Sequence, residues 1–184
     1  IEKRPIMRAA NKEFSKVGMY NWGRGVFRYE PKKASELGDS SFFFLKKGDL
    51  IISGQFAWEG SVSIVDKEFE GCVCSHRFHV INGKVGQVNN EYLWSYFTSQ
   101  EGHFLLSENS SGAAGRNRPL NIEKLLKEKV PIPPLQVQAK FEKLVAQTQA
   151  YEDFAKRRIK LLKEYRQSLI SEVVTGKVKV TRDE

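Results

Sequence analysis

The stretch KVPIPPLQVQAKFEKL, residues 129–144, divides the chain into two parts of different character. Before it, short apolar runs lie between turn residues such as Gly, Asn and Asp, a pattern typical of a domain with strands. After Leu135 a helical pattern continues without proline or glycine as far as Gly176. Because proline fixes φ and lacks an N–H donor, the prolines within the stretch predict an extended elbow that sets the direction of the helix.

The residues after the elbow predict one long helix from Leu135 to Val174, closed by Gly176 as its C-cap. At about 1.5 Å per residue such a helix would be roughly 60 Å long. Apolar residues recur along it in steps of three and four, the spacing of a coiled-coil seam. A single helix cannot bury such a seam by itself, so we expect dimerisation with a second helix. The seam consists of Phe141, Leu144, Val145, Thr148, Tyr151, Ala155, Ile159, Leu162, Tyr165, Leu169 and Val173.

The composition indicates a globular protein with an excess of positive charge. The 184 residues are 40% apolar and 28% charged, and the net charge is +8. This charge favours polyanions such as nucleic acid, but it is equally compatible with a charge that only serves solubility. No apolar run reaches the roughly 18–20 residues that cross a bilayer, and no apolar segment of a signal peptide follows Ile1. We therefore expect no membrane partner.

Residues 1–130 are predicted to form an α+β domain with a curled, mostly antiparallel sheet and short helices. Short strands bounded by turn residues favour this arrangement over βαβ units. The strands are predicted at 42–45, 50–52, 62–65 and 72–81. Residues 131–184 are predicted to hold the elbow, the long helix and a tail.

Two short helices and a long loop complete the predicted domain. Asn89 is a candidate N-cap for a helix over residues 91–100, and Asn121 for a helix over the residues that follow it. Segment 107–119 is rich in Gly, Ser and Asn, so it is predicted to be a loop.

Several segments combine basic or amide side chains with glycine or aromatic residues, as loops that contact DNA do. A glutamine amide suits adenine, and an arginine fork suits guanine or phosphate. Each segment also has a purely structural interpretation. The segment with Arg24 and Arg28 would be a loop anchored by its hydrophobic side chains, and Trp58 would belong to the core. His76 would lie at the edge of the core, and the loop with Arg116 to Arg118 would be solvated. The candidate DNA-binding residues are Arg24, Arg28, Gln55, Trp58, His76, Arg77, Arg116, Asn117 and Arg118.

Both ends of the predicted helix resemble the specificity subunit of type I restriction–modification systems. In that family a Pro-Pro-Leu-x-x-Gln segment ends each target recognition domain, and here it runs from Pro133 to Gln138. The family's long helix closes with Arg-x-Ser-Leu-Ile-x-x-x-Val-Thr-Gly-Lys, here Arg166 to Lys177. The segments KKGDLIISGQFAWEG (46–60) and GAAGRNRPLNIEKL (112–125) are also similar to its recognition domain.

The resemblance implies a protein that reads one half of a split target in double-stranded DNA. The long helix would set the spacing between half-sites, while separate methyltransferase and motor-nuclease subunits would supply the chemistry in the cytoplasm. A complete specificity subunit carries two recognition domains and two helices, whereas this sequence has one of each. The chain would therefore pair with itself or with another half. The alternative is a coiled-coil assembly or adhesin module with a protein-binding head.

No catalytic site, cofactor or metal is expected. Ile132 and Leu135 replace the polar and aromatic residues of the Asp/Asn-Pro-Pro-aromatic motif found in amino-methyltransferases, and no Gly-rich cofactor loop is present. The side chains of Cys72, Cys74, His76 and His79 are of the types that bind zinc. However, alternate residues on a strand lie roughly 6.6 Å apart, which is wide for a pair of thiolates bound to one zinc ion.

Overall fold

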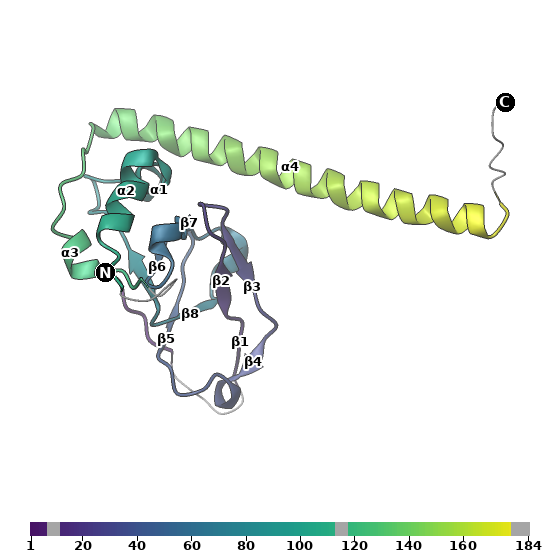
Figure 1. Cartoon of the computed structure of the whole chain (residues 1–184), viewed down its shortest axis with the longest axis horizontal. Coiled ribbons are helices and arrows are strands. Elements are labelled where there is room, and N and C mark those ends of the chain that lie inside the picture. Colours follow the sequence, from purple (N-terminus) through teal and green to yellow (C-terminus); the bar gives the residue numbers. More distant parts are fainter. Residues whose placement is uncertain (7–11, 113–117, 178–184) are drawn as a thin grey trace. The chain divides into compact units, whose positions relative to one another are not determined.

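The computed structural model describes residues 1–6, 12–112 and 118–177. Its contacts divide the chain into two compact units, Ile1–Glu142 and Lys143–Glu184. The first unit combines short strands, single-turn 3-10 helices and α-helices, and the long helix α4 (Leu135–Val174) begins within it (Figure 1). The predicted α+β class is therefore confirmed. None of the described helices is both long and apolar enough to span a membrane.

The strands of the first unit form small antiparallel sheets rather than one continuous sheet. In the described residues β1 pairs with β4, β2 with β3 and β5 with β8, and a three-stranded sheet has the order β7-β6-β9. The strands are β1 (Glu13–Phe14), β2 (Val17–Met19), β3 (Val26–Arg28), β4 (Lys32–Lys33), β5 (Phe42–Phe44), β6 (Leu50–Ser53), β7 (Val62–Ile64), β8 (Val73–Ser75) and β9 (Phe78–Ile81). Every pairing among these strands is antiparallel, as the sequence predicts.

Strand β6 is the centre of the core because both of its faces are buried. Leu50 and Ile52 face a cluster that includes the helices α1 (Asn90–Thr98), α2 (Gln100–Glu108) and α3 (Ile122–Leu125). Ile51, on the opposite face, packs in a second cluster with residues of β2 and β8. This division follows from the alternation of side chains along a strand.

Residues 72–81, predicted as one strand, are two strands that belong to different sheets. Strand β8 pairs with β5 and strand β9 with β6, and His76 and Arg77 form the exposed turn between them. The prediction of a single strand was wrong because polar Ser75, His76 and Arg77 were taken as part of one strand with the apolar residues on either side. The chain changes sheets there without the Gly or Pro that normally marks a turn.

Helix α2 (Gln100–Glu108) is not among the predicted elements, because the sequence places Gln100 in the preceding helix and residues 107–119 in a loop. Ser99 ends α1 and caps α2, with its Oγ accepting a hydrogen bond from Gly102 N over 3.2 Å. A Cβ on Gly102 would lie 2.0 Å from the carbonyl oxygen of Tyr96, so the tight corner between the two helices requires glycine there. The predicted cap at Asn121 is confirmed, because its Oδ1 accepts from Lys124 N over 2.9 Å.

The elbow is confirmed, and one buried side chain connects it to the domain. Helix α4 begins at Leu135, where the carbonyl of Pro134 accepts from Val137 N and Gln138 N. Gln138 is fully buried. Its Nε2 donates to the carbonyls of Gln87 over 2.9 Å and Pro133 over 2.7 Å, and its Oε1 accepts from Asn89 N over 2.8 Å. The amide thus uses both donors and its acceptor to fix the start of α4.

Tyr92 of α1 also contacts the elbow and the start of α4. Its hydroxyl donates to the carbonyl of Pro131, and its ring meets the ring of Phe141 edge-on with centroids 5.4 Å apart. Phe141, placed in the dimerisation seam from the sequence, therefore contacts its own domain.

The second unit consists of the remainder of α4 and its cap. Large apolar side chains along the helix are exposed, among them Tyr151, Leu162 and Tyr165. At its end Gly176 N donates to Val173 O and Lys177 N to Glu172 O, the bond pair of a Schellman cap. The C-cap predicted at Gly176 is confirmed.

Replacing Gln138 with leucine is expected to destabilise the protein by about 2–4 kcal/mol, because a buried N–H and two carbonyls lose their partners. The matched control is Gln136→Leu, which makes the same change at an exposed position two residues earlier. The free energies of unfolding come from denaturant titrations. Equal effects of the two substitutions would show that the amide contacts contribute nothing.

Candidate nucleic-acid interface

An open cavity of about 510 Å³ brings together candidate residues from two separate segments. Gln55 follows β6, and Arg77 lies in the turn between β8 and β9. Both line the cavity, and Arg77 Nη1 donates to Gln55 Oε1 over 3.5 Å, at the outer limit of a hydrogen bond. The structure thus places side by side an amide, a group that suits adenine, and a guanidinium, a group that suits guanine.

The backbone around Gln55 is held close to the turn that carries Arg77. Ser53 Oγ accepts from the backbone N–H groups of both Gln55 and Phe56. Gly54 N donates to the carbonyl of Arg77 over 2.6 Å. A Cβ on Gly54 would lie 2.8 Å from that same carbonyl oxygen, so only glycine permits this approach. The segments that carry Gln55 and Arg77 are therefore joined by a close backbone contact.

The cavity has the electrostatic character of a polyanion site. Lys16 and Arg77 supply positive charge, and none of the described residues that line the cavity is acidic. Tyr29 and Phe56 add exposed aromatic surface. This combination of cations, an amide and aromatic rings suits contact with DNA phosphates and bases.

Sequence reasoning did not select Lys16, Tyr29 or Phe56 as candidate DNA-binding residues. Tyr29 belongs to the aromatic and basic segment that supplied Arg24 and Arg28, so a signal was present. Lys16 gives no signal in the sequence, because only the packing of β2 beside β8 brings it to the cavity.

Arg118 packs inside the domain. Its guanidinium lies 5.0 Å from the centre of the Trp58 ring, and its Nη2 donates to the carbonyl of Ser110 over 3.3 Å. Trp58 is half-buried. These two candidates are therefore neighbours, but their contact holds the loop to the domain. Arg116 and Asn117 lie outside the described residues.

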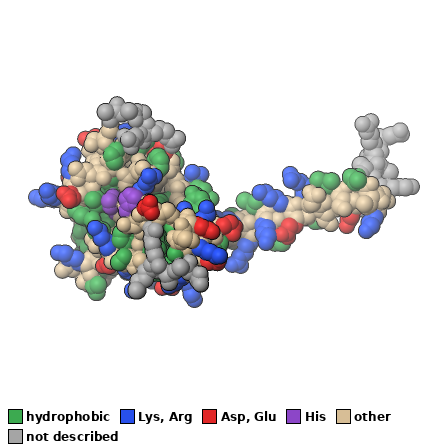
Figure 2. Space-filling model, turned by 90° about the horizontal axis from the view of Figure 1, so that it is seen from below, with side chains coloured by type: hydrophobic (Ala, Val, Ile, Leu, Met, Phe, Trp, Pro, Cys, Tyr) green, Lys and Arg blue, Asp and Glu red, His purple; other side chains and the backbone are tan. Residues whose placement is uncertain are grey.

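The remaining candidates lie apart from the cavity lining. Arg24, in the turn between β2 and β3, donates from Nε to the carbonyl of Asn21 over 2.9 Å. Arg28, at the end of β3, donates to the carbonyl of Glu68. His76 is exposed in the same turn as Arg77. Figure 2 accordingly shows Lys and Arg side chains scattered over one face of the first unit rather than joined in a single patch.

The cysteines belong to the core. Cys72 and Cys74 are buried and are not joined in a disulfide, and burial raises the pKa of Cys74 to about 12. Within the described residues, no group of three or more His, Cys, Asp or Glu side chains could hold a metal ion.

Comparison with known proteins identifies the family. A family model described as the type I restriction modification DNA specificity domain matches residues 1–164. The chain belongs to this family. The search of curated proteins finds no match.

Solved structures of type I systems share the fold of this DNA specificity domain. The chain superposes on the HsdS subunit from Thermoanaerobacter tengcongensis with a TM-score of 0.65 at 14% identity, covering 100% of this chain and 48% of that one. A second structure, described as showing complex assembly and conformational transition of the type I R-M system, gives a TM-score of 0.62 at 16% identity, again covering 100% and 48%. The chain thus spans about half the length of the solved structures it matches.

Burial and the nearby Lys3 lower the pKa of His79 in the folded protein, with burial the larger cause. The unfolded chain then binds a proton at His79 more readily than the folded chain does. The contribution of neutral His79 to the free energy of unfolding is therefore fully present above about pH 6.5 and is lost as the pH falls below that value. We expect the free energy of unfolding to decrease between about pH 7 and pH 5. The His79→Gln variant should show a smaller decrease in denaturant titrations. Identical slopes in the two proteins would contradict this role of His79.

Because the Cys74 thiol is buried and its pKa is raised to about 12, it should resist alkylation in the folded protein at pH 8. Iodoacetamide labelling followed by peptide mass spectrometry should detect modification of Cys74 only after denaturation. Rapid labelling of Cys74 in the native protein would contradict the buried placement.

Proposed function

We propose that this chain is the DNA-reading half of a type I specificity subunit, with residues 1–130 as its target recognition domain. The observation that carries the proposal is the acid-free cavity in which Gln55 and Arg77 meet. In a DNA specificity domain, a forked guanidinium beside an amide would be suited to reading bases.

Bases are read in this proposal from loops held by a rigid scaffold. Gln55 and Arg77 come from the ends of strands whose own side chains fill the core, so their backbones are fixed before DNA arrives. Lys16 lies in the same cavity and would contact phosphate. Arg24, Arg28 and His76 would contribute positive or polar contacts around the rim.

Helix α4 serves as the spacer in the proposed subunit. At about 100° per residue, Leu144, Phe154, Leu161, Leu162, Tyr165 and Leu169 lie within about 80° of Tyr151 around the helix. The charged residues Glu152, Asp153, Lys156, Arg157, Lys160, Lys163 and Glu164 occupy the opposite side. Four charged residues of the second unit are exceptions, because they fall within the apolar face: Lys143, Arg158, Arg166 and Glu172. An exposed apolar face of this width favours a second helix as its partner.

The predicted seam describes this face incompletely. Phe154 and Leu161 are exposed on the same side of α4 although the three-and-four spacing omitted them. Val145, in contrast, is buried within the single chain. The proposed helix contact is therefore broader than a two-residue-per-heptad coiled-coil seam.

The chemistry of the system would lie in other polypeptides. Methyltransferase subunits would bind around paired helices, and a motor-nuclease subunit would join the assembly on DNA in the cytoplasm. The chain would then act without a catalytic site or cofactor of its own, supplying sequence choice and the distance between half-sites.

The DNA target can be found from the methylation pattern of cells that express the chain with its methyltransferase. On that duplex, Arg77→Ala should weaken specific binding about 5- to 150-fold, the range for loss of one bidentate base contact. It should weaken non-specific binding much less. Lys84→Ala, which removes one exposed positive charge outside the Gln55–Arg77 cavity, is the control. Fluorescence anisotropy at several salt concentrations gives both affinities.

Equal loss of specific and non-specific affinity in Arg77→Ala would make this arginine a phosphate contact only. Absence of any DNA binding by the wild-type chain, with tight binding to another protein instead, would favour the adhesin or assembly module.

Self-association through α4 should depend on its apolar face. Leu162→Glu is expected to convert dimers into monomers, because it places a charge in the paired surface. Gln167→Glu adds the same charge on the opposite side of the helix and should leave the dimer intact. Sedimentation velocity at micromolar concentrations measures the mass. A monomeric wild-type chain would contradict self-pairing.

A further inference from the structure

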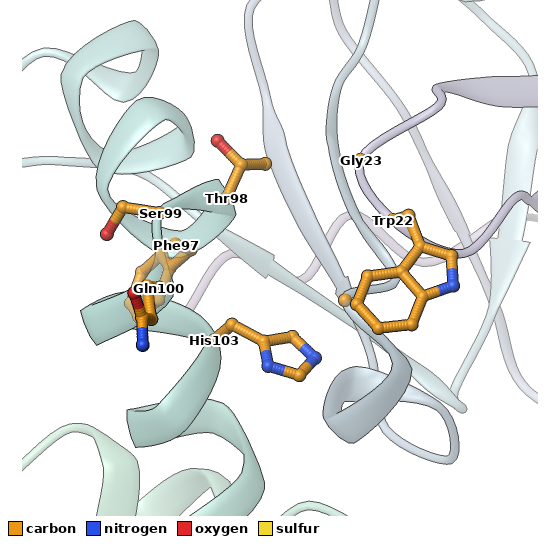
Figure 3. Close-up of a pocket in the computed structure, with 8 residues that line it drawn as sticks. Trp22, Gly23, Phe97, Thr98, Ser99, Gln100 and His103 are labelled. Carbon is orange, nitrogen blue, oxygen red and sulfur yellow. The ribbon is translucent and has the colours of Figure 1, made fainter.

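A second cavity, separate from the Gln55–Arg77 cavity, lies between the β2–β3 turn and the corner of α1 and α2 (Figure 3). Its volume is about 280 Å³. Trp22 forms one wall and is 68% exposed, an unusual position for the largest apolar side chain. Its ring stacks on that of His103, with centroids 5.1 Å apart and planes inclined by 19°. Phe97 lines the same cavity from α1.

The backbone holds Trp22 in this exposed position. Trp22 N donates to Glu59 O over 3.0 Å, and Gly23 N donates to Gly60 O over 2.9 Å. The side chain of Asn21 donates to the Glu59 carboxylate, and this fixes the turn to the 3-10 helix η2 (Ala57–Glu59). Trp22 also has a φ of 62°, a left-handed conformation that costs free energy in a bulky residue. The fold thus keeps a large aromatic ring exposed at a cost in strain.

Polar groups accompany the aromatic wall. His103 Nε2 is buried and forms no hydrogen bond with any described residue. The exposed side chain of Gln100 lines the cavity and offers both a donor and an acceptor. Aromatic faces together with an amide and a ring nitrogen suit a flat heterocycle with a polar edge. The volume lies at the lower end of the range for small-molecule sites, which fits one ring system rather than two.

We propose that this pocket receives a single nucleobase displaced from the DNA stack, which stacks on Trp22 and presents its polar edge to Gln100. Arg24, exposed in the same turn, would lie near the backbone of the displaced nucleotide. The inference rests on the proposed function, because the base belongs to the DNA that the chain reads. It adds a second kind of contact, in which the ease of unstacking a base contributes to specificity.

The experiment measures binding of the whole chain to its target duplex and to a series in which each base in turn faces an abasic site. Removing the pairing partner lowers the cost of displacing a base. At one position, binding should become about 10-fold tighter than to the intact duplex, within the range that stacking on an aromatic ring provides. The Trp22→Asn variant should lose this gain, because asparagine tolerates the left-handed backbone but has no ring. Trp22→Phe should retain most of it.

Tyr29→Ala removes another exposed aromatic ring and serves as the control, which should weaken binding to intact and abasic duplexes equally. A gain that persists in Trp22→Asn, or no gain at any position in the wild type, would overturn the base pocket while leaving specific DNA binding established. Loss of methyltransferase assembly in Trp22→Asn with unchanged DNA binding would also overturn it, in favour of a protein contact. If the wild-type chain binds no duplex specifically, the proposed function itself fails.

Discussion

The buried amide of Gln138 is the interaction on which the junction between the domain and the first turn of α4 depends. The prolines before the helix cannot hold this turn by backbone donors, because they form no N–H hydrogen bonds. Gln138 supplies what they lack, through two donated bonds and one accepted bond to the loop before α1 and to the elbow. Tyr92 adds a hydrogen bond and an aromatic contact. The Pro-Pro-Leu-x-x-Gln segment thus has a physical explanation. Its prolines form a stiff connector, and its glutamine fixes the first turn of the helix by hydrogen bonds.

The domain separates the task of folding from the task of recognition. Strand β6 buries both of its faces, and the helices cover one of the clusters it forms. The side chains that can meet a ligand come from places where the strands end: Gln55 after β6, Arg77 between β8 and β9, and Trp22 between β2 and β3. These connections lie outside the core, so they can vary in sequence at little cost to its packing.

The sequence predicted the elements that depend on local chemistry. The start of α4 at Leu135, the caps at Asn121 and Gly176, and the short antiparallel strands all follow from proline, capping and alternation rules. It failed where tertiary contacts decide. The turn at His76 and Arg77 contains no Gly or Pro to mark it. Gly102 permits the tight corner between α1 and α2, but in the sequence a glycine at this place indicates the end of a helix. Lys16 reaches its cavity only through the packing of β2 beside β8. The sequence placed Arg118 in a loop with forked donors, but its contact with the Trp58 ring depends on tertiary packing and could not be predicted.

The contact of Gly54 with the carbonyl of Arg77 has a consequence for how such a domain can acquire new specificities. Gln55 and Arg77 are 22 positions apart in the chain, yet the backbone beside Gln55 is packed against the backbone of Arg77. If one of these segments were exchanged between related proteins, its residues would have to pack at the Gly54–Arg77 contact against a segment with which they did not evolve. Inheritance of new preferences is expected to proceed by point changes at Gln55 and Arg77, or by transfer of the entire block that contains both, rather than by shuffling single loops.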